Sequence, residues 1–172
     1  MIMPRGQQLL LPVNPLFIVL SLLAALALNM LPLGRVAWLP DPLLLLLGFW
    51  AMHQPQRIGL GLGFMLGLCM DVAHYALLGQ HALAYALVVF GAGAMARRLS
   101  WFSSPVQALH MLPLFALAHG LQVLLRVVGG GILPGPELLA APVIEALLWP
   151  LVSGILLAPQ RRSPTGEENR PL

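Results

Sequence analysis

Long apolar runs, separated by short polar or proline-rich breaks, make up most of this chain. A helix that crosses a membrane needs about 20 predominantly apolar residues. The pattern therefore predicts six membrane-spanning helices, at about residues 16–33, 43–52, 58–75, 79–95, 104–128 and 138–157. Two of them begin with Asn14-Pro15 and Ser104-Pro105, which combine a capping side chain with a proline at the first helical position.

The second run, residues 43–52, is too short to cross a membrane by itself. At helical rise it covers about 15 Å of a hydrocarbon core about 30 Å thick. Two arrangements fit this length. The helix either extends back to Trp38, or it is a tilted, partly re-entrant helix packed inside the bundle.

The third run carries glycines at a regular spacing. Gly59, Gly63 and Gly67 recur every four residues, and Asp71 is the next member of the series. Residues four apart share one helical face, and glycines there let a second helix approach closely. We expect Asp71 to point into this helix–helix interface, because a carboxylate facing lipid would cost roughly 2.5–3.5 kcal/mol. On this interpretation the bundle surrounds the glycine helix.

The composition supports a membrane protein. The chain has 172 residues, of which 59% are hydrophobic and only 9% charged, and its mean hydropathy is +0.86. A soluble domain has about 25% charged residues. We therefore predict an all-α polytopic membrane protein, a compact bundle of six transmembrane helices with a short second helix. It forms one domain at residues 1–159, followed by a disordered cytoplasmic tail at residues 160–172.

The charges indicate the orientation. All nine basic residues are arginines, and they lie at the ends of apolar runs, so we interpret them as topology signals and expect no nucleic-acid partner. With six spans, two arginines fall on one side, Arg35 and Arg126. The other seven share the side of both termini: Arg5, Arg57, Arg97, Arg98, Arg161, Arg162 and Arg170. The positive-inside rule then places both termini in the cytoplasm.

Ionisable side chains inside the predicted spans are the candidate functional residues. Asp71 lies fourteen residues past Arg57, about 21 Å at helical rise, and therefore sits toward the outer leaflet. The full set collects in that outer half: Asp71, His74, His81, His119, Arg126 and Glu145. It could form a polar pocket, a partner-docking site or a proton relay. It could also be a set of interhelical hydrogen bonds with an Arg126–Glu145 pair, which we favour because polar groups commonly join membrane helices.

No catalytic signature accompanies these residues. The histidines lack HExxH-type spacing, the serines lack a nucleophile elbow, and neither a Walker nor a dinucleotide fingerprint occurs. The single cysteine, Cys69, excludes an internal disulfide and a Cys-based metal site. We therefore predict a protein that is not an enzyme and uses no metal or cofactor.

A series of short motifs runs along the chain: Pro40-Asp41-Pro42, Phe49-Trp50, Pro55-Gln56-Arg57, Gly61-x-Gly63-Phe64, Gly67, Asp71, Leu78-Gly79-x-x-Ala82-Leu83 and Leu148-Trp149-Pro150. Their order resembles the MreD family of bacterial rod shape-determining membrane proteins. The resemblance covers nearly the whole chain. Its motif residues include Pro42, Pro55, Arg57 and Gly79.

The resemblance implies a function that spacing alone does not. Members of that family act in the inner membrane with the machinery that elongates the lateral cell wall. Their partners are MreC, MreB, the glycan polymerase RodA and its penicillin-binding transpeptidase. In architecture they are similar to the substrate-binding subunits of vitamin transporters. The resemblance thus favours a scaffold or regulator that binds MreC in the lipid bilayer. The alternative is a small-ligand-binding transporter subunit with an outward-facing polar pocket.

Overall fold

The computed structural model describes residues 13–31 and 38–160. These segments contain helices and no strand. The helices are α1 (Pro15–Asn29), α2 (Pro42–His53), α3 (Leu60–Ala73), α4 (Gln80–Leu99), α5 (Ser104–Val128) and α6 (Ala140–Leu157), with the short 3-10 segments η1 (Pro136–Leu139) and η2 (Ala158–Gln160).

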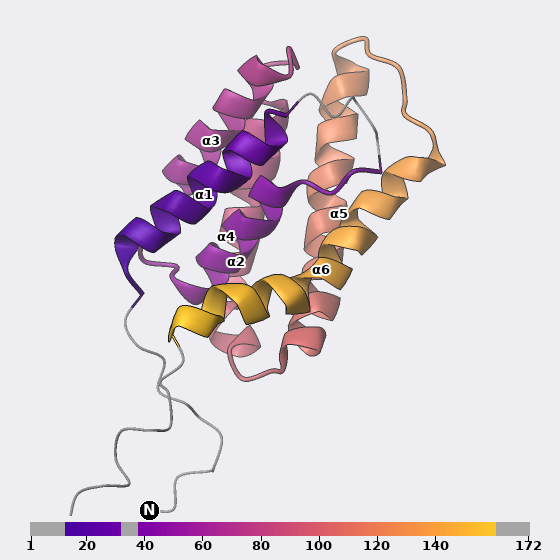
Figure 1. Ribbon diagram of the computed structural model, residues 1–172. Coiled ribbons are helices and arrows are strands. Elements are labelled where there is room, and N and C mark those ends of the chain that lie inside the picture. The colour runs from indigo at the N-terminus through magenta and orange to yellow at the C-terminus, as the bar shows by residue number, and fades with distance from the viewer. Residues whose placement is uncertain (1–12, 32–37, 161–172) are drawn as a thin grey trace, which may run out of the picture.

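Successive helices from α3 to α6 run up and down a single bundle (Figure 1). The α3–α4 turn and the α5–α6 loop lie at its upper end in this view. The start of α1, the α4–α5 turn and the end of α6 lie toward its lower end. Pro150 lies inside α6, where its ring interrupts the backbone hydrogen-bond ladder. The helix changes direction along its length, as a proline kink explains (Figure 1).

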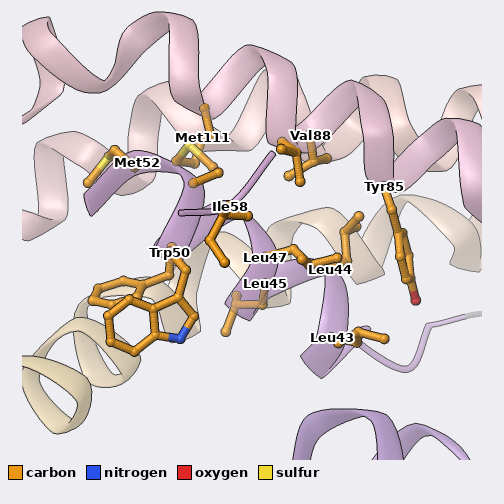
Figure 2. Packing of buried hydrophobic residues seen from close by; sticks show 14 of the residues in the cluster. Leu43, Leu44, Leu45, Leu47, Trp50, Met52, Ile58, Tyr85, Val88 and Met111 are labelled. Carbon is orange, nitrogen blue, oxygen red and sulfur yellow. The ribbon is translucent and has the colours of Figure 1, made fainter. Parts of the chain in front are cut away.

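The short helix α2 is the centre of this bundle. Nine of its residues are buried, among them Leu43, Leu44, Leu47 and Trp50, each 0% exposed. Figure 2 shows its leucines packed against Val88 of α4 and other core side chains. A helix that is apolar on every side can lie in the core of the protein, as α2 does. The sequence-based expectation that the bundle surrounds the glycine helix is therefore wrong, because only four residues of α3 are buried.

The structure also decides between the two arrangements of the second run. The helix does not extend back to Trp38, because Asp41 caps its N-terminus and Pro42 is its first residue. The Asp41 side chain meets the hydroxyl of Tyr85, a residue in the second turn of α4. The helix is therefore packed inside the bundle and starts beside α4.

Three helices are long and apolar enough to cross a membrane: α4, α5 and the continuous helical stretch Pro136–Gln160 that contains α6. In the rest of the described chain, α1, α2 and α3 are apolar but have 15, 12 and 14 residues. An all-helical fold with a short second helix is thus confirmed, whereas six membrane crossings are not. Residue Gln160, the first of the predicted disordered tail, is the last residue of η2 and is buried. The rest of that tail lies outside the described residues, and so do Arg5, Arg35, Arg161, Arg162 and Arg170.

Candidate functional site: a polar network inside the bundle

Asp71 holds the corner between α3 and α4. It is 1% exposed, and its Oδ2 accepts hydrogen bonds from the backbone N–H groups of Gly79 at 2.8 Å and Ala82 at 3.4 Å. Its Oδ1 lies 2.7 Å from the N–H of His81 and 2.8 Å from that residue's Nδ1. The first N–H groups of a helix have no partner within the helix, so a side chain from outside must satisfy them. Asp71 does this for α4 from the preceding helix.

Glycines bring α3 against α4 at this corner. A Cβ on Gly67 would lie 2.3 Å from the Cα of Ala82, and one on Gly63 would lie 2.8 Å from Val89 Cγ2. Gly67 therefore allows a backbone-to-backbone approach that no other residue permits. Gly59 differs from the sequence-based expectation. It is the N-cap of α3, and a Cβ there would meet nothing within 4 Å.

Asp41 is the centre of a second polar cluster. Its Oδ1 accepts hydrogen bonds from Asn29 Nδ2 at 2.6 Å and from the backbone N–H of Leu44 at 3.0 Å. Its Oδ2 accepts one from the hydroxyl of Tyr85 at 2.5 Å. The side chain thus joins the end of α1, the start of α2 and the N-terminal part of α4. We call this set, with Glu145 and His119, the Asp41 cluster.

Glu145 and His119 complete the Asp41 cluster from α6 and α5. Glu145 is 0% exposed, and its Oε1 accepts a hydrogen bond of 2.9 Å from the backbone N–H of Asp41. The same oxygen lies 2.8 Å from His119 Nε2. Non-helical backbone survives at membrane depth only where protein groups satisfy it. Glu145 provides that partner for the chain entering α2.

The expected Arg126–Glu145 pair is not formed. The ion pairs found within the described segments are His81–Asp71 and His119–Glu145, and Arg126 is exposed near the end of α5. The physical reason is position along the helix. Arg126 lies seven residues beyond His119, about 10 Å farther along α5. Glu145 meets α5 at His119, so Arg126 lies too far along the helix to reach it.

The two clusters touch each other. The His81 ring, bonded to Asp71, makes an edge contact with the Tyr85 ring at 6.1 Å between centroids. His74 bonds the backbone carbonyl of Asn29 through Nε2 at 3.2 Å. The polar residues predicted for the outer half of the membrane therefore form one connected network, with Arg126 apart from it.

The motif residues stand at turns. Pro42 is the first residue of α2, and Pro55 is exposed in the turn before α3. Arg57, in the same turn, donates a hydrogen bond of 3.0 Å from Nη1 to the carbonyl of Val13. Gly79 has a φ of 101°, a left-handed conformation that glycine adopts without strain.

Sequence reasoning missed Asp41, Tyr85 and Asn29 as network members. One signal could have found Asp41. The second helix is too short to cross the membrane and begins inside the protein. Its capping side chain must therefore lie inside the protein as well. The Asp41-Pro42 pair marks that start.

Comparison with known families decides the assignment. The sequence profile described as rod shape-determining protein MreD matches residues 9–158. The chain belongs to the MreD family. It is thus a membrane protein of bacterial rod-shape determination, as its motifs predicted. No solved structure matches, so similarity of this MreD chain to vitamin-transporter subunits stays an expectation.

The network of this MreD protein is built for joining helices. Among the described residues no group of three His, Cys, Asp or Glu side chains could hold a metal ion. The carboxylates of Asp41, Asp71 and Glu145 bond backbone N–H groups and polar side chains of neighbouring helices, which links all six helices to one another. Each such bond joins segments that lipid alone would not hold together.

Proposed function

We propose that this protein is a non-enzymatic scaffold of the machinery that elongates the lateral cell wall. In this proposal it crosses the inner membrane six times with both termini in the cytoplasm, and it binds MreC within the bilayer. RodA, its penicillin-binding transpeptidase and MreB belong to the same complex. Membership of the MreD family supports the shape-determining role.

One observation carries the preference for a scaffold over a ligand-binding subunit. The polar side chains of the outer half bond to each other and to backbone, as Glu145 does through Oε1 to His119 and to the Asp41 N–H, while its Oε2 is buried without a hydrogen-bond partner among the described residues. A ligand pocket needs convergent polar groups that are free to meet the ligand. A network in which most polar atoms already have protein partners supports a closed bundle whose function lies on its outer faces.

The apolar outer faces supply the surface that a scaffold needs. On α6, one stripe of aliphatic side chains at every fourth residue points outward: Val143, Leu147, Leu151 and Ile155, with exposed fractions of 46%, 74%, 59% and 60%. Such a stripe suits lipid or the transmembrane helix of a partner.

Retention of partners tests the proposal directly. The tagged protein is purified in mild detergent from its native membranes, and retained proteins and water-soluble small molecules are identified by mass spectrometry. We expect MreC and no stoichiometric water-soluble molecule. A bound small molecule in the absence of MreC would favour the transporter-subunit alternative.

A variant at His119 distinguishes a scaffold from a ligand-binding subunit in cells. His119→Gln retains an amide donor for Glu145, so a structural network keeps its helix contact. We expect rod shape and normal membrane abundance. Round cells at normal abundance would mean that the imidazole itself is required, as in a ligand or proton site.

A further inference from the structure

A long apolar groove separates α1 from α3. It has a volume of about 460 Å³. Its floor consists of the buried side chains Ile18, Leu22 and Ile58, and half-exposed Val19 and Leu62 stand at its rims. The groove exists because α1 packs mainly on α2 and touches α3 little. Ligand sites commonly enclose about 300–1,000 Å³, so this space is large enough for a molecule.

A single arginine stands at one end of the groove. Arg57 is among its lining residues, in the turn that precedes α3. Its Nη1 donates to the carbonyl of Val13, which places it beside the start of α1. Both ion pairs found within the described segments involve histidine, so Arg57 has no carboxylate partner there. A guanidinium has five N–H donors, and one bond to a carbonyl leaves several for an anion.

The length of the groove fits an acyl chain. Its α1 lining runs over residues 15–23, which is about 12 Å at helical rise. One leaflet of the hydrocarbon core is about 15 Å thick. A groove that starts at an arginine and continues along aliphatic side chains for most of one leaflet has the layout of a lipid molecule.

We infer that this groove binds one anionic phospholipid, with an acyl chain between α1 and α3 and the phosphate at Arg57. This inference rests on the proposed topology, in which Arg57 faces the cytoplasm. The cytoplasmic leaflet is the one whose anionic lipids attract arginine. Charge complementarity favours an anionic lipid over a partner helix, since a helix would leave the guanidinium without an anion.

Native mass spectrometry of the purified full chain tests the site. The probes are phosphatidylglycerol and phosphatidylethanolamine with identical acyl chains. We expect one phosphatidylglycerol to be retained about fivefold more strongly than phosphatidylethanolamine. Arg57→Gln should remove this preference, and Arg126→Gln, at the other end of the bundle, should leave it intact. Equal retention of the two lipids by the wild type would overturn the inference.

A second pair of variants tests the groove without altering Arg57. Leu62→Trp fills the groove, whereas Leu147→Trp makes the same change on the outer face of α6. We expect the bound lipid to be lost only with Leu62→Trp. Lipid retained by this variant would place the lipid elsewhere and refute the site.

Crosslinking in native membranes identifies the occupant. A photoreactive residue at Val19 should form an adduct with phospholipid. An adduct with another protein, or with a second copy of this chain, would overturn the inference in favour of a docking groove.

The mass measurement is made in detergent, where the orientation of the protein in the membrane has no effect. If the proposed six-span topology is wrong, the measured preference for phosphatidylglycerol is unaffected. If that preference is absent, the scaffold proposal is unaffected.

Discussion

At the scale of single residues, the unusual feature is that a carboxylate inside the bundle accepts a hydrogen bond from the backbone N–H of Asp41. Asp41 begins α2 at depth, and Glu145 accepts its N–H. In lipid no water can replace such a partner, and each unsatisfied group costs several kcal/mol. The polar side chains are therefore required by the position of the α2 start. We expect substitutions here to reduce folded protein first and activity second.

Tyr85→Phe tests the Asp41 cluster at one atom. It removes the hydroxyl that donates to Asp41 Oδ2 and leaves the ring in its 0%-exposed site. An intramolecular hydrogen bond contributes about 0.5–1.5 kcal/mol, so thermal stability in detergent should fall. Tyr75→Phe is the matched control, because Tyr75 is 91% exposed. Equal melting temperatures for the two variants would show that the Tyr85 bond adds nothing.

Asp71 responds differently to two substitutions. Asp71→Leu removes every acceptor from the start of α4 and leaves buried donors unsatisfied, at about 1–3 kcal/mol each. Asp71→Asn keeps one oxygen but turns an NH₂ group toward N–H donors. We therefore expect the order wild type, Asn, Leu in membrane abundance, with Asn intermediate. A rounded-cell phenotype for Asn at wild-type abundance would mean that the carboxylate has a role beyond capping.

At the scale of elements, α3 and α4 pack closely because glycines on α3 have no side chain to hold them apart. Gly67 lies against the backbone of Ala82, so α3 can turn directly into the helix whose N-terminus Asp71 caps. Packing and capping thus act on the same corner. Lipid supplies no hydrophobic drive for this contact, and close approach replaces it.

Two Gly→Ala changes on α3 should have opposite signs. Gly67→Ala places a methyl 2.3 Å from Ala82 Cα and must push the helices apart. Gly61→Ala meets nothing within 4 Å, and alanine is favoured over glycine in a helix by about 0.5–1 kcal/mol. Thermal unfolding in detergent should show a loss for the first and a small gain for the second. Equal changes in thermal stability for the two variants would mean that α4 does not pack against Gly67.

At the scale of the whole molecule, the bundle holds a helix that lipid does not reach. The N-cap of α2 lies at depth, and α1 and α3 flank it as short apolar helices. A helix of about 14 residues spans roughly 21 Å, less than the hydrocarbon thickness. We expect the bilayer to thin or the short helices to extend beside this part of the molecule.

Reporter fusions test the proposed six crossings. Fusions after Arg98 and after Gln160 should report the cytoplasm, and one within residues 129–131 should report the periplasm. The expectation follows from seven arginines on the side of the termini against two on the other. A periplasmic signal after Gln160 would place the C-terminus outside the cytoplasm and refute the proposed arrangement.

The sequence by itself determined the class of protein, the order of its helices and its family. Apolar runs and breaker residues are local signals, so the capped start at Asn14-Pro15 and the short second helix followed from them directly. The predicted cap Ser104 is instead the first residue of α5, and Ser103 is its N-cap. Placement of the MreD motifs along the chain needed no coordinates, and the family match covers residues 9–158.

Only the tertiary structure decided which helix lies at the centre and which polar groups meet. In a membrane, an apolar residue fits lipid and core equally well, so hydrophobic periodicity does not reveal which face is buried. Depth estimates placed Glu145 beside Arg126. Its actual partners, His119 and the Asp41 N–H, depend on how α5 and α6 are rotated and on the chain entering the bundle before α2. Those rotations are set by contacts between distant segments, which a linear pattern does not contain.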